Sequence, residues 1–226
     1  MTKNPFIVIN KIVKNNINTK HLAAWETIWR MASLLYPRGG SHGAEHILIV
    51  CLNVIDICTK DFVSKETKSI AVTAAALHDI GRFIQAGKNH ANVGAVWLRT
   101  TCMNIDKIIV RDYWDKVLSS IQLHSAYDQC TQEYHKILWD ADKLDSTGYL
   151  GLLRMGMRSG ELEGTRFLSI DQNVAPLKDE LQNKIALFTR AHFFTRQGRV
   201  IAKTKVKILT FALQEIEYLH NYFPLS

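Results

Sequence analysis

The sequence predicts an all-α protein, and three observations lead to that prediction. Apolar residues recur at intervals of three and four along most of the chain, which is the period of an amphipathic helix. No stretch alternates polar and apolar residues cleanly enough to predict a strand. Only four prolines and twelve glycines interrupt the 226 residues, which favours long helices. We find neither an internal repeat nor a low-complexity segment. The length of 226 residues is most simply that of one domain.

The first half of the chain is expected to hold four main helices. Residues 1–18 give only a weak signal, for a short helix or a loose arm. Ser41 and Ser64 are each in position to cap the helix that follows, and we expect a loop over residues 81–88. The expected helices cover about 21–36, 43–59, 64–79 and 89–102.

In the second half, a polar loop at residues 126–133 separates two stretches of apolar period. Residues 160–175 are expected to form a second loop, and Pro176 fits the first position of the next helix. The expected helices cover about 106–125, 134–160, 176–195 and 198–222. We expect a single domain over residues 1–226, with a core at about 40–160, an N-terminal helical extension at 1–37 and C-terminal helices at 176–222.

Composition and charge limit the partners. The formal net charge of +7 suits an anionic ligand such as a phosphate ester, although it also suits nucleic acid or mere solubility. The basic residues are scattered rather than grouped in an arginine-rich tract, so nucleic-acid binding is disfavoured. The four cysteines form no CxxC pair and are expected to be free thiols. We find no signal peptide and no apolar run of membrane-spanning length, so we expect a cytoplasmic protein without a membrane partner.

The stretch AAALHDIGRF, residues 74–83, is the first candidate for chemistry. It is an apolar helix that ends in two adjacent metal-competent side chains, His78 and Asp79, and Gly81 follows, where a chain leaves a helix easily. A buried imidazole and a buried carboxylate need partners. Taken alone, the pair is most simply a capped helix end whose two side chains satisfy each other, so other donors must decide its meaning.

Two further segments offer metal donors. HGAEH places His42 and His46 four residues apart on one helix face, which is a good spacing for metal ligands. In WDADKLD, Asp142 and Asp145 share a helix face among apolar neighbours, and buried carboxylates need a cation. A mixed set of histidine and aspartate suits a divalent transition metal or a hydrolytic Mg or Mn site rather than a structural zinc.

HGAEH also fits H-x-x-E-H, the inverted zinc-protease motif, in which Glu45 would be the base. That alternative is disfavoured, because a match of five residues arises easily by chance in a chain with nine histidines. It also leaves HDIG and DADKLD unexplained.

The order His46, then His78 and Asp79, then Asp142 resembles the H…HD…D signature of the HD-domain metal-dependent phosphohydrolases. The segments SHGAEHILIV, IQLHS, GYLGLLR and TRQGRVIA are similar to segments of a small bacterial subfamily of these hydrolases, in the same order. The resemblance covers about residues 40–222. It implies an all-helical bundle in which those four side chains converge from separate helices and hold the first metal ion.

The resemblance also implies roles for other residues. Asp142 is preferred to Asp140 as the ligand, because the aspartate of the family precedes a basic residue and a leucine. His90 and His124 match positions that in some relatives bind a second metal ion or the substrate phosphate, and with Asp79 they are the candidate catalytic residues. His42 would contact the substrate or a metal ligand. The candidate substrate-binding residues are His42, Arg82, Lys88, Lys143 and Arg154.

We therefore expect a hydrolase in which one or two divalent ions (Mn, Mg, Fe, Co, Ni or Zn) activate water against a phosphomonoester or phosphodiester of a nucleotide or small metabolite. Asp79 would orient or deprotonate that water. Two alternatives stay open: a non-catalytic HD module that binds a nucleotide, and a di-iron oxygenase on the same ligands. The HD-GYP cyclic-dinucleotide branch is disfavoured because no GYP follows HDIG. A homodimer is left open.

Overall fold

The structure is a computed structural model that describes residues 4–85, 87, 89–103, 111–163, 170–189 and 193–222. Over these ranges every regular element is a helix, so the expected all-α bundle is confirmed. Two short 3-10 helices are Thr19–His21 (η1) and Tyr127–Gln129 (η2). The α-helices are α1 (Pro5–Lys14), α2 (Leu22–Leu35), α3 (Ala44–Lys60), α4 (Lys65–Leu77), α5 (Gly81–Ile84), α6 (His90–Met103), α7 (Arg111–Leu123), α8 (Glu133–Asp145), α9 (Gly148–Glu163), α10 (Ile170–Thr189) and α11 (Arg196–Tyr222).

Helix α4 is the central helix of the bundle. Every residue from Ser69 to Leu77 is buried, and the helix packs against α3, α7 and α8. Four of these nine residues are alanines, and such small side chains let the neighbouring helices approach closely. Because His78 and Asp79 follow directly at the C-terminal end of α4, the packing of this helix fixes where both side chains lie.

The weak signal at the N-terminus corresponds to a well-packed helix. Asn4 caps α1, because its side-chain oxygen accepts a hydrogen bond from the backbone N–H of Phe6 at 3.0 Å. Ile9 and Val13 are fully buried, and α1 packs against α3 and α4. The indole N–H of Trp25 in α2 donates to Asn10 at 2.8 Å and so joins α2 to α1.

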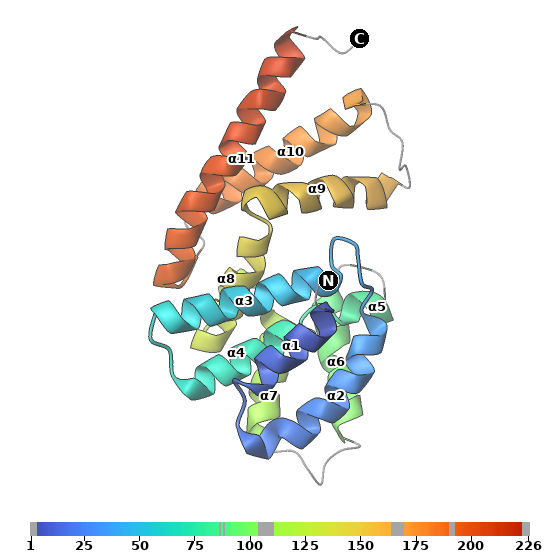
Figure 1. Cartoon of the computed structure of the whole chain (residues 1–226), viewed down its shortest axis with the longest axis vertical. Helices are drawn as coiled ribbons and strands as arrows, with labels where there is room; N and C mark the ends of the chain where they lie inside the picture. Colours follow the sequence, from blue (N-terminus) through green and yellow to red (C-terminus); the bar gives the residue numbers. More distant parts are fainter. Residues whose placement is uncertain are drawn as a thin grey trace.

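Figure 1 shows α9, α10 and α11 grouped at one end of the molecule and α1 to α7 at the other, with α8 leading from one group to the other. Asp140 of α8 anchors the start of α11. Its carboxylate accepts hydrogen bonds from the backbone N–H groups of Phe194 at 3.0 Å and Thr195 at 2.7 Å, and from the Thr195 hydroxyl at 2.6 Å. Burial nevertheless raises the pKa of Asp140 to about 6.

Residues 134–160, which were expected to form one helix, are two helices with a sharp break between them. The hydroxyls of Ser146 and Thr147 donate to the carbonyls of Lys143 and Leu144, at 2.8 and 2.5 Å, and so compete with the continuation of the helix. Gly148 then has a φ of +71°, a left-handed conformation that glycine adopts without strain. This break turns α9 away from the axis of α8 (Figure 1).

Other helix boundaries also differ from the sequence prediction. Residues 81–84 form the short helix α5 in the segment expected to be a loop. Helix α9 continues to Glu163 and α10 begins at Ile170, so much of the expected loop over 160–175 is helical. Pro176 therefore lies inside α10 rather than at its first position.

Of the two serine caps that were expected, one is present. Ser64 caps α4 by accepting from the N–H of Thr67 at 3.1 Å. Ser41 does not cap α3, whose N-cap is Gly43 without a side-chain hydrogen bond. The expected helix start at Asp106 lies outside the described residues. Within the part of the chain that is described, no helix is both long enough and apolar enough to cross a bilayer.

Candidate metal centre

Seven histidine and aspartate side chains meet at one point beside the C-terminal end of α4. They come from the loop before α3, from α3 itself, from the end of α4, from the start of α6, from the residue after α7 and from α8. These are all of the residues that the sequence predicted as metal ligands or catalytic groups, together with His42. The seven are His42, His46, His78, Asp79, His90, His124 and Asp142.

The carboxylate of Asp79 lies at the centre of this cluster and is 1% exposed. Its Oδ2 lies 2.8 Å from His42 Nδ1, 3.4 Å from His46 Nε2 and 3.7 Å from His78 Nε2. Its Oδ1 lies 2.7 Å from Arg82 Nε, 3.3 Å from His90 Nε2 and 3.8 Å from His124 Nε2. Both oxygens therefore face imidazole nitrogens, one on each side of the carboxylate.

Asp142 and Asp140 point in different directions. Asp142 Oδ1 lies 3.6 Å from His46 Nε2 and 3.7 Å from His78 Nε2, within the cluster. Asp140 faces α11 and is occupied by the hydrogen bonds of Phe194 and Thr195. Asp142, the aspartate that the sequence favoured as a ligand, therefore lies in the cluster, and Asp140 lies outside it.

The ring tautomers follow from partners that can only accept hydrogen bonds. His78 Nδ1 faces the carbonyl of Ala75 at 2.8 Å, and His124 Nδ1 faces the carbonyl of Ile121 at 2.6 Å. Because a carbonyl oxygen has no proton to give, Nδ1 carries the proton in the neutral form of both rings, which leaves a lone pair on Nε2. His46 Nδ1 faces the carboxylate of Asp145 at 2.6 Å, so the same reasoning applies.

These lone pairs converge, and the arrangement fits a cation. His46 Nε2 and His78 Nε2 lie 3.1 Å apart, although neither carries a proton to share. Two nitrogen ligands at about 2.1 Å from one ion are separated by about 3.0–3.4 Å when the angle between them is near 90–110°. Three sets of donors lie within 4.8 Å of one another: His42 with His46 and Asp79, His46 with His78 and Asp142, and His78 with Asp79 and His124. These groups can hold a metal ion.

The protonation states also suit metal binding. Burial opposes the charge of Asp79, but His78 and the hydrogen bond from His42 hold the pKa of this carboxyl well below its usual range. For Asp142, burial is likewise outweighed by Lys143 and His78, which lower its pKa well below the usual range. Burial, aided by His78, lowers the pKa of His124 to about 3. At neutral pH the carboxylates are charged and His124 is neutral, which is the state that metal ligation requires.

A cavity of about 120 Å³ opens beside the cluster. It brings together four of the predicted substrate-binding residues, namely His42, Arg82, Lys143 and Arg154. Two of them also hold protein carboxylates: Lys143 Nζ lies 2.6 Å from Asp142 Oδ2, and Arg154 pairs with Asp145. Lys88, the fifth predicted residue, lies outside the described residues.

Sequence reasoning missed several residues at this cavity. Glu180 and Lys184 of α10 line it, as do Ser41 and Ser146. The two residues from α10 have no motif and lie far along the chain from the other donors, so only the fold reveals them. Asp145 had a sequence signal, because it shares a helix face with Asp142, but nothing in the pattern indicated that it contacts His46.

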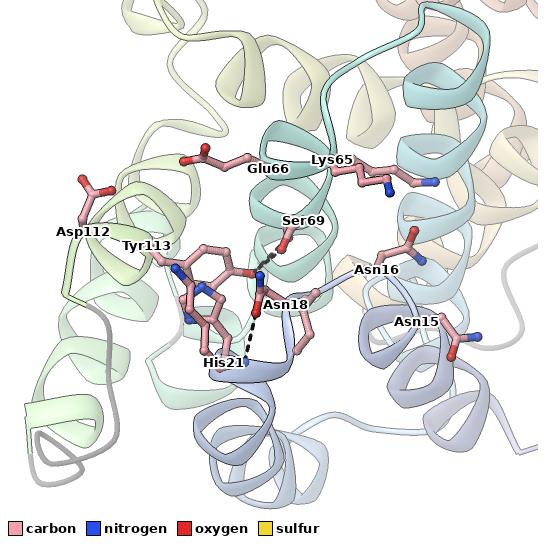
Figure 2. Close-up of a pocket in the computed structure, with 12 residues that line it drawn as sticks. Asn15, Asn16, Asn18, His21, Lys65, Glu66, Ser69, Asp112 and Tyr113 are labelled. Carbon is pink, nitrogen blue, oxygen red and sulfur yellow. Dashed lines mark hydrogen bonds between the residues drawn. The ribbon is translucent and has the colours of Figure 1, made fainter.

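A larger cavity, of about 610 Å³, lies at the opposite end of α4 and holds no such cluster (Figure 2). The 13 residues of α4 separate the two places by about 20 Å. His21 stacks on Tyr113 there with ring centroids 3.9 Å apart. The two acidic residues of its lining, Glu66 and Asp112, both pair with Lys116. The candidate chemistry therefore lies at the smaller cavity.

Comparison with known proteins shows which structures share this fold. No protein-family model and no curated protein sequence matches the chain. Bacillus subtilis YpgQ in complex with ADP is similar in structure, with a TM-score of 0.58 and 21% identity over 86% of this chain and 97% of that one. A second crystal structure of Bacillus subtilis YpgQ is similar too, with a TM-score of 0.55 and 20% identity over 97% of this chain and 96% of that one.

A structural-genomics target from Lactobacillus plantarum also matches, with a TM-score of 0.59 and 14% identity over 98% of this chain and 99% of that one. The fold is that of YpgQ. The alignments with the Lactobacillus plantarum protein and with the second YpgQ structure cover 98% and 97% of this chain, so the likeness extends over almost all of it.

Proposed function

We propose that this protein is a metal-dependent phosphohydrolase of the HD-domain type, which cleaves a phosphomonoester or phosphodiester of a nucleotide or another small metabolite. The observation that carries the proposal is the convergence of His46, His78, Asp79 and Asp142, with imidazole lone pairs and carboxylate oxygens facing one point. The ordered H…HD…D pattern and the YpgQ-like fold support the same reading.

In this proposal those four side chains hold the first ion. When bound, a divalent ion lowers the pKa of its water toward neutrality and polarises a phosphoryl oxygen. His90 and His124, whose Nε2 atoms lie 3.1 Å apart on the other side of Asp79, take a second ion or the substrate phosphate. Asp79 serves both sides because each of its oxygens faces a different histidine group.

The side chains around Asp79 prepare it to orient water. The Nδ1–H of His42 donates to one carboxylate oxygen at 2.8 Å, and Arg82 donates to the other at 2.7 Å, so the plane of the carboxylate is fixed. His42 also lines the cavity and leaves Nε2 to accept a proton from a ligand there. The guanidinium of Arg82 can balance the charge that builds on phosphoryl oxygens.

The charge of the cavity supports a phosphorylated ligand. Four cationic side chains, Arg82, Lys143, Arg154 and Lys184, line it. Three of them already pair with the carboxylates of Asp79, Asp142 and Asp145, and their remaining N–H groups can still donate to phosphoryl oxygens. The ADP complex of YpgQ supports a nucleotide as the ligand class. A cavity of about 120 Å³ is small for a whole nucleotide, so it would receive the phosphate end of the ligand.

The test is a screen of nucleotides and phosphorylated metabolites with protein reconstituted with Mn, Mg, Co, Ni or Fe, with phosphate release as the readout. Asp79→Ala is the blank. Asp115→Asn, at a half-exposed aspartate far from the cluster, is the matched control and should keep full turnover. Metal-dependent release that is absent in Asp79→Ala supports the proposal. Tight nucleotide binding without turnover of any compound would replace it with a non-catalytic binding module.

A further inference from the structure

We infer that Asp145 is a positioning residue, which holds the imidazole of His46 in the tautomer and orientation that metal ligation needs, and that Arg154 braces Asp145 from α9. This inference rests on the metal centre of the proposed function. Asp145 is 1% exposed, and its Oδ2 lies 2.6 Å from His46 Nδ1. The contact joins residues 99 positions apart, from α3 and α8.

His46 depends on a remote partner for its Nδ1 proton, which His78 and His124 do not. His78 and His124 each donate Nδ1–H to a backbone carbonyl three residues earlier, so their own helical turns fix their tautomers. His46 lies in the first turn of α3, and Asp145 is the partner of its Nδ1. Without an acceptor at Nδ1, the proton can move to Nε2, and a protonated Nε2 has no lone pair for a metal ion.

Arg154 fixes Asp145 in turn. Its guanidinium pairs with Asp145 Oδ2 and donates through Nε to the carbonyl of Ser41 at 2.8 Å. Ser41 directly precedes His42, so one arginine connects α9, the end of α8 and the loop that carries His42. A buried carboxylate needs such a cationic partner, because an unpaired buried charge is costly. This use of Arg154 differs from the phosphate contact that the sequence predicted for it.

The alternative is that Asp145 and Arg154 form an ion pair that only stabilises the packing of α8 against α9. The two readings differ in what happens to metal affinity and to the His46 ring when the acceptor is removed. Asp145→Asn can keep a carbonyl oxygen near His46 Nδ1, so it is the conservative variant. Asp145→Leu removes the acceptor. The double variant Asp145→Leu/Arg154→Leu removes it while replacing the buried pair with apolar groups, an exchange that is often neutral for stability.

The experiment measures Mn²⁺ affinity by competition with a fluorescent chelator, and the His46 tautomer by ¹⁵N chemical shifts of the metal-free protein, for all variants. The control is Asp61→Asn, which removes the charge of a partly buried aspartate that follows α3 and pairs with Arg196 of α11, without touching the cluster. Melting curves show which variants fold.

We expect Asp145→Leu and the double variant to lose roughly 10- to 100-fold in Mn²⁺ affinity, with the His46 proton shifted from Nδ1 toward Nε2. Asp145→Asn should keep most of the affinity, and Asp61→Asn should keep all of it. Excess Mn²⁺ should restore turnover in a folded Asp145→Leu. Wild-type affinity and an unchanged His46 tautomer in the double variant would overturn the inference. If the wild type itself binds no divalent ion, the proposed function fails, and the tautomer comparison still decides the role of Asp145.

Discussion

Gly81 lies where α5 and α6 cross, and replacing it with alanine should displace His90 from the cluster. A Cβ added at Gly81 would lie 2.0 Å from the carbonyl oxygen of His90 and 2.6 Å from the backbone nitrogen of Gly94. Both atoms belong to the helical backbone of α6, so no flexible side chain can move aside. To reach the 3.4 Å at which ordinary contact begins, the start of α6 must move by about 1.4 Å, the difference between 3.4 and 2.0 Å.

Such a displacement is large compared with the geometry of the cluster. His90 Nε2 lies 3.3 Å from Asp79 Oδ1 and 3.1 Å from His124 Nε2. We expect Gly81→Ala to lower the free energy of unfolding by about 1–3 kcal/mol, the usual cost of overpacking. We also expect turnover to fall by roughly 100-fold, because misplacement by about 1 Å is enough to cost that much.

Urea denaturation and phosphate release measure the two effects separately. Gly156→Ala is the matched control, because nothing lies within 4 Å of a Cβ added at Gly156 in α9. That variant should be more stable than the wild type by about 0.5–1 kcal/mol, the difference in helix propensity between alanine and glycine. Wild-type stability and turnover in Gly81→Ala would refute the reasoning about this helix crossing.

Three further predictions concern other parts of the structure. Gly198→Ala should lower the free energy of unfolding in urea by about 1–3 kcal/mol without changing metal affinity. The added Cβ would lie 2.5 Å from Oδ2 of Asp140, the carboxylate that anchors α11. Unchanged stability would contradict this prediction. His46→Ala should purify largely metal-free. His42→Ala should keep its metal and lose only part of its turnover, because His42 donates a hydrogen bond to Asp79. Equal metal loss in the two variants, measured by elemental analysis, would favour the zinc-protease alternative. The metal-free protein should become less stable as the pH falls from 7 to 5. Burial lowers the pKa of four histidines in the folded protein, so below about pH 6.5 the unfolded chain binds more protons than the folded one. The stability that these neutral histidines contribute at higher pH is therefore lost as the pH falls. The raised pKa of Asp140 has the opposite effect, but it concerns one group against four. Equal stability in urea at both pH values would contradict this account. The four histidines are His21, His42, His124 and His135.

The local part of the fold could be predicted from the sequence. The spacing of apolar residues predicted the position of most helices. Ser64 was identified as a cap because its side chain and the backbone N–H that it accepts from lie only three residues apart. The break between α8 and α9 was missed, because the apolar period continues across Ser146 and Thr147 while the hydroxyl contacts and the φ of Gly148 end the helix. A prediction based on the spacing of apolar residues extends a helix through a single turn of this kind, because the turn does not interrupt the spacing.

The candidate site shows the same division. The motifs identified the donors that converge, because each carries its chemistry in its own residue type and neighbours. The partners of those donors could not be found in this way. The contact of Asp145 with His46, and the position of Lys184 beside the cavity, depend on how α8 and α10 pack against α3. Such contacts between distant segments are properties of the tertiary structure, which a single sequence does not reveal.

The most direct test of the metal centre is anomalous scattering from a crystal of the protein grown with Mn²⁺. We predict a strong anomalous peak within about 2.0–2.2 Å of Nε2 of His46 and of His78 and of carboxylate oxygens of Asp79 and Asp142. A peak at that position that vanishes in a folded His78→Ala variant would confirm the assignment. A well-ordered cluster without any peak, or a peak held by other side chains, would contradict it.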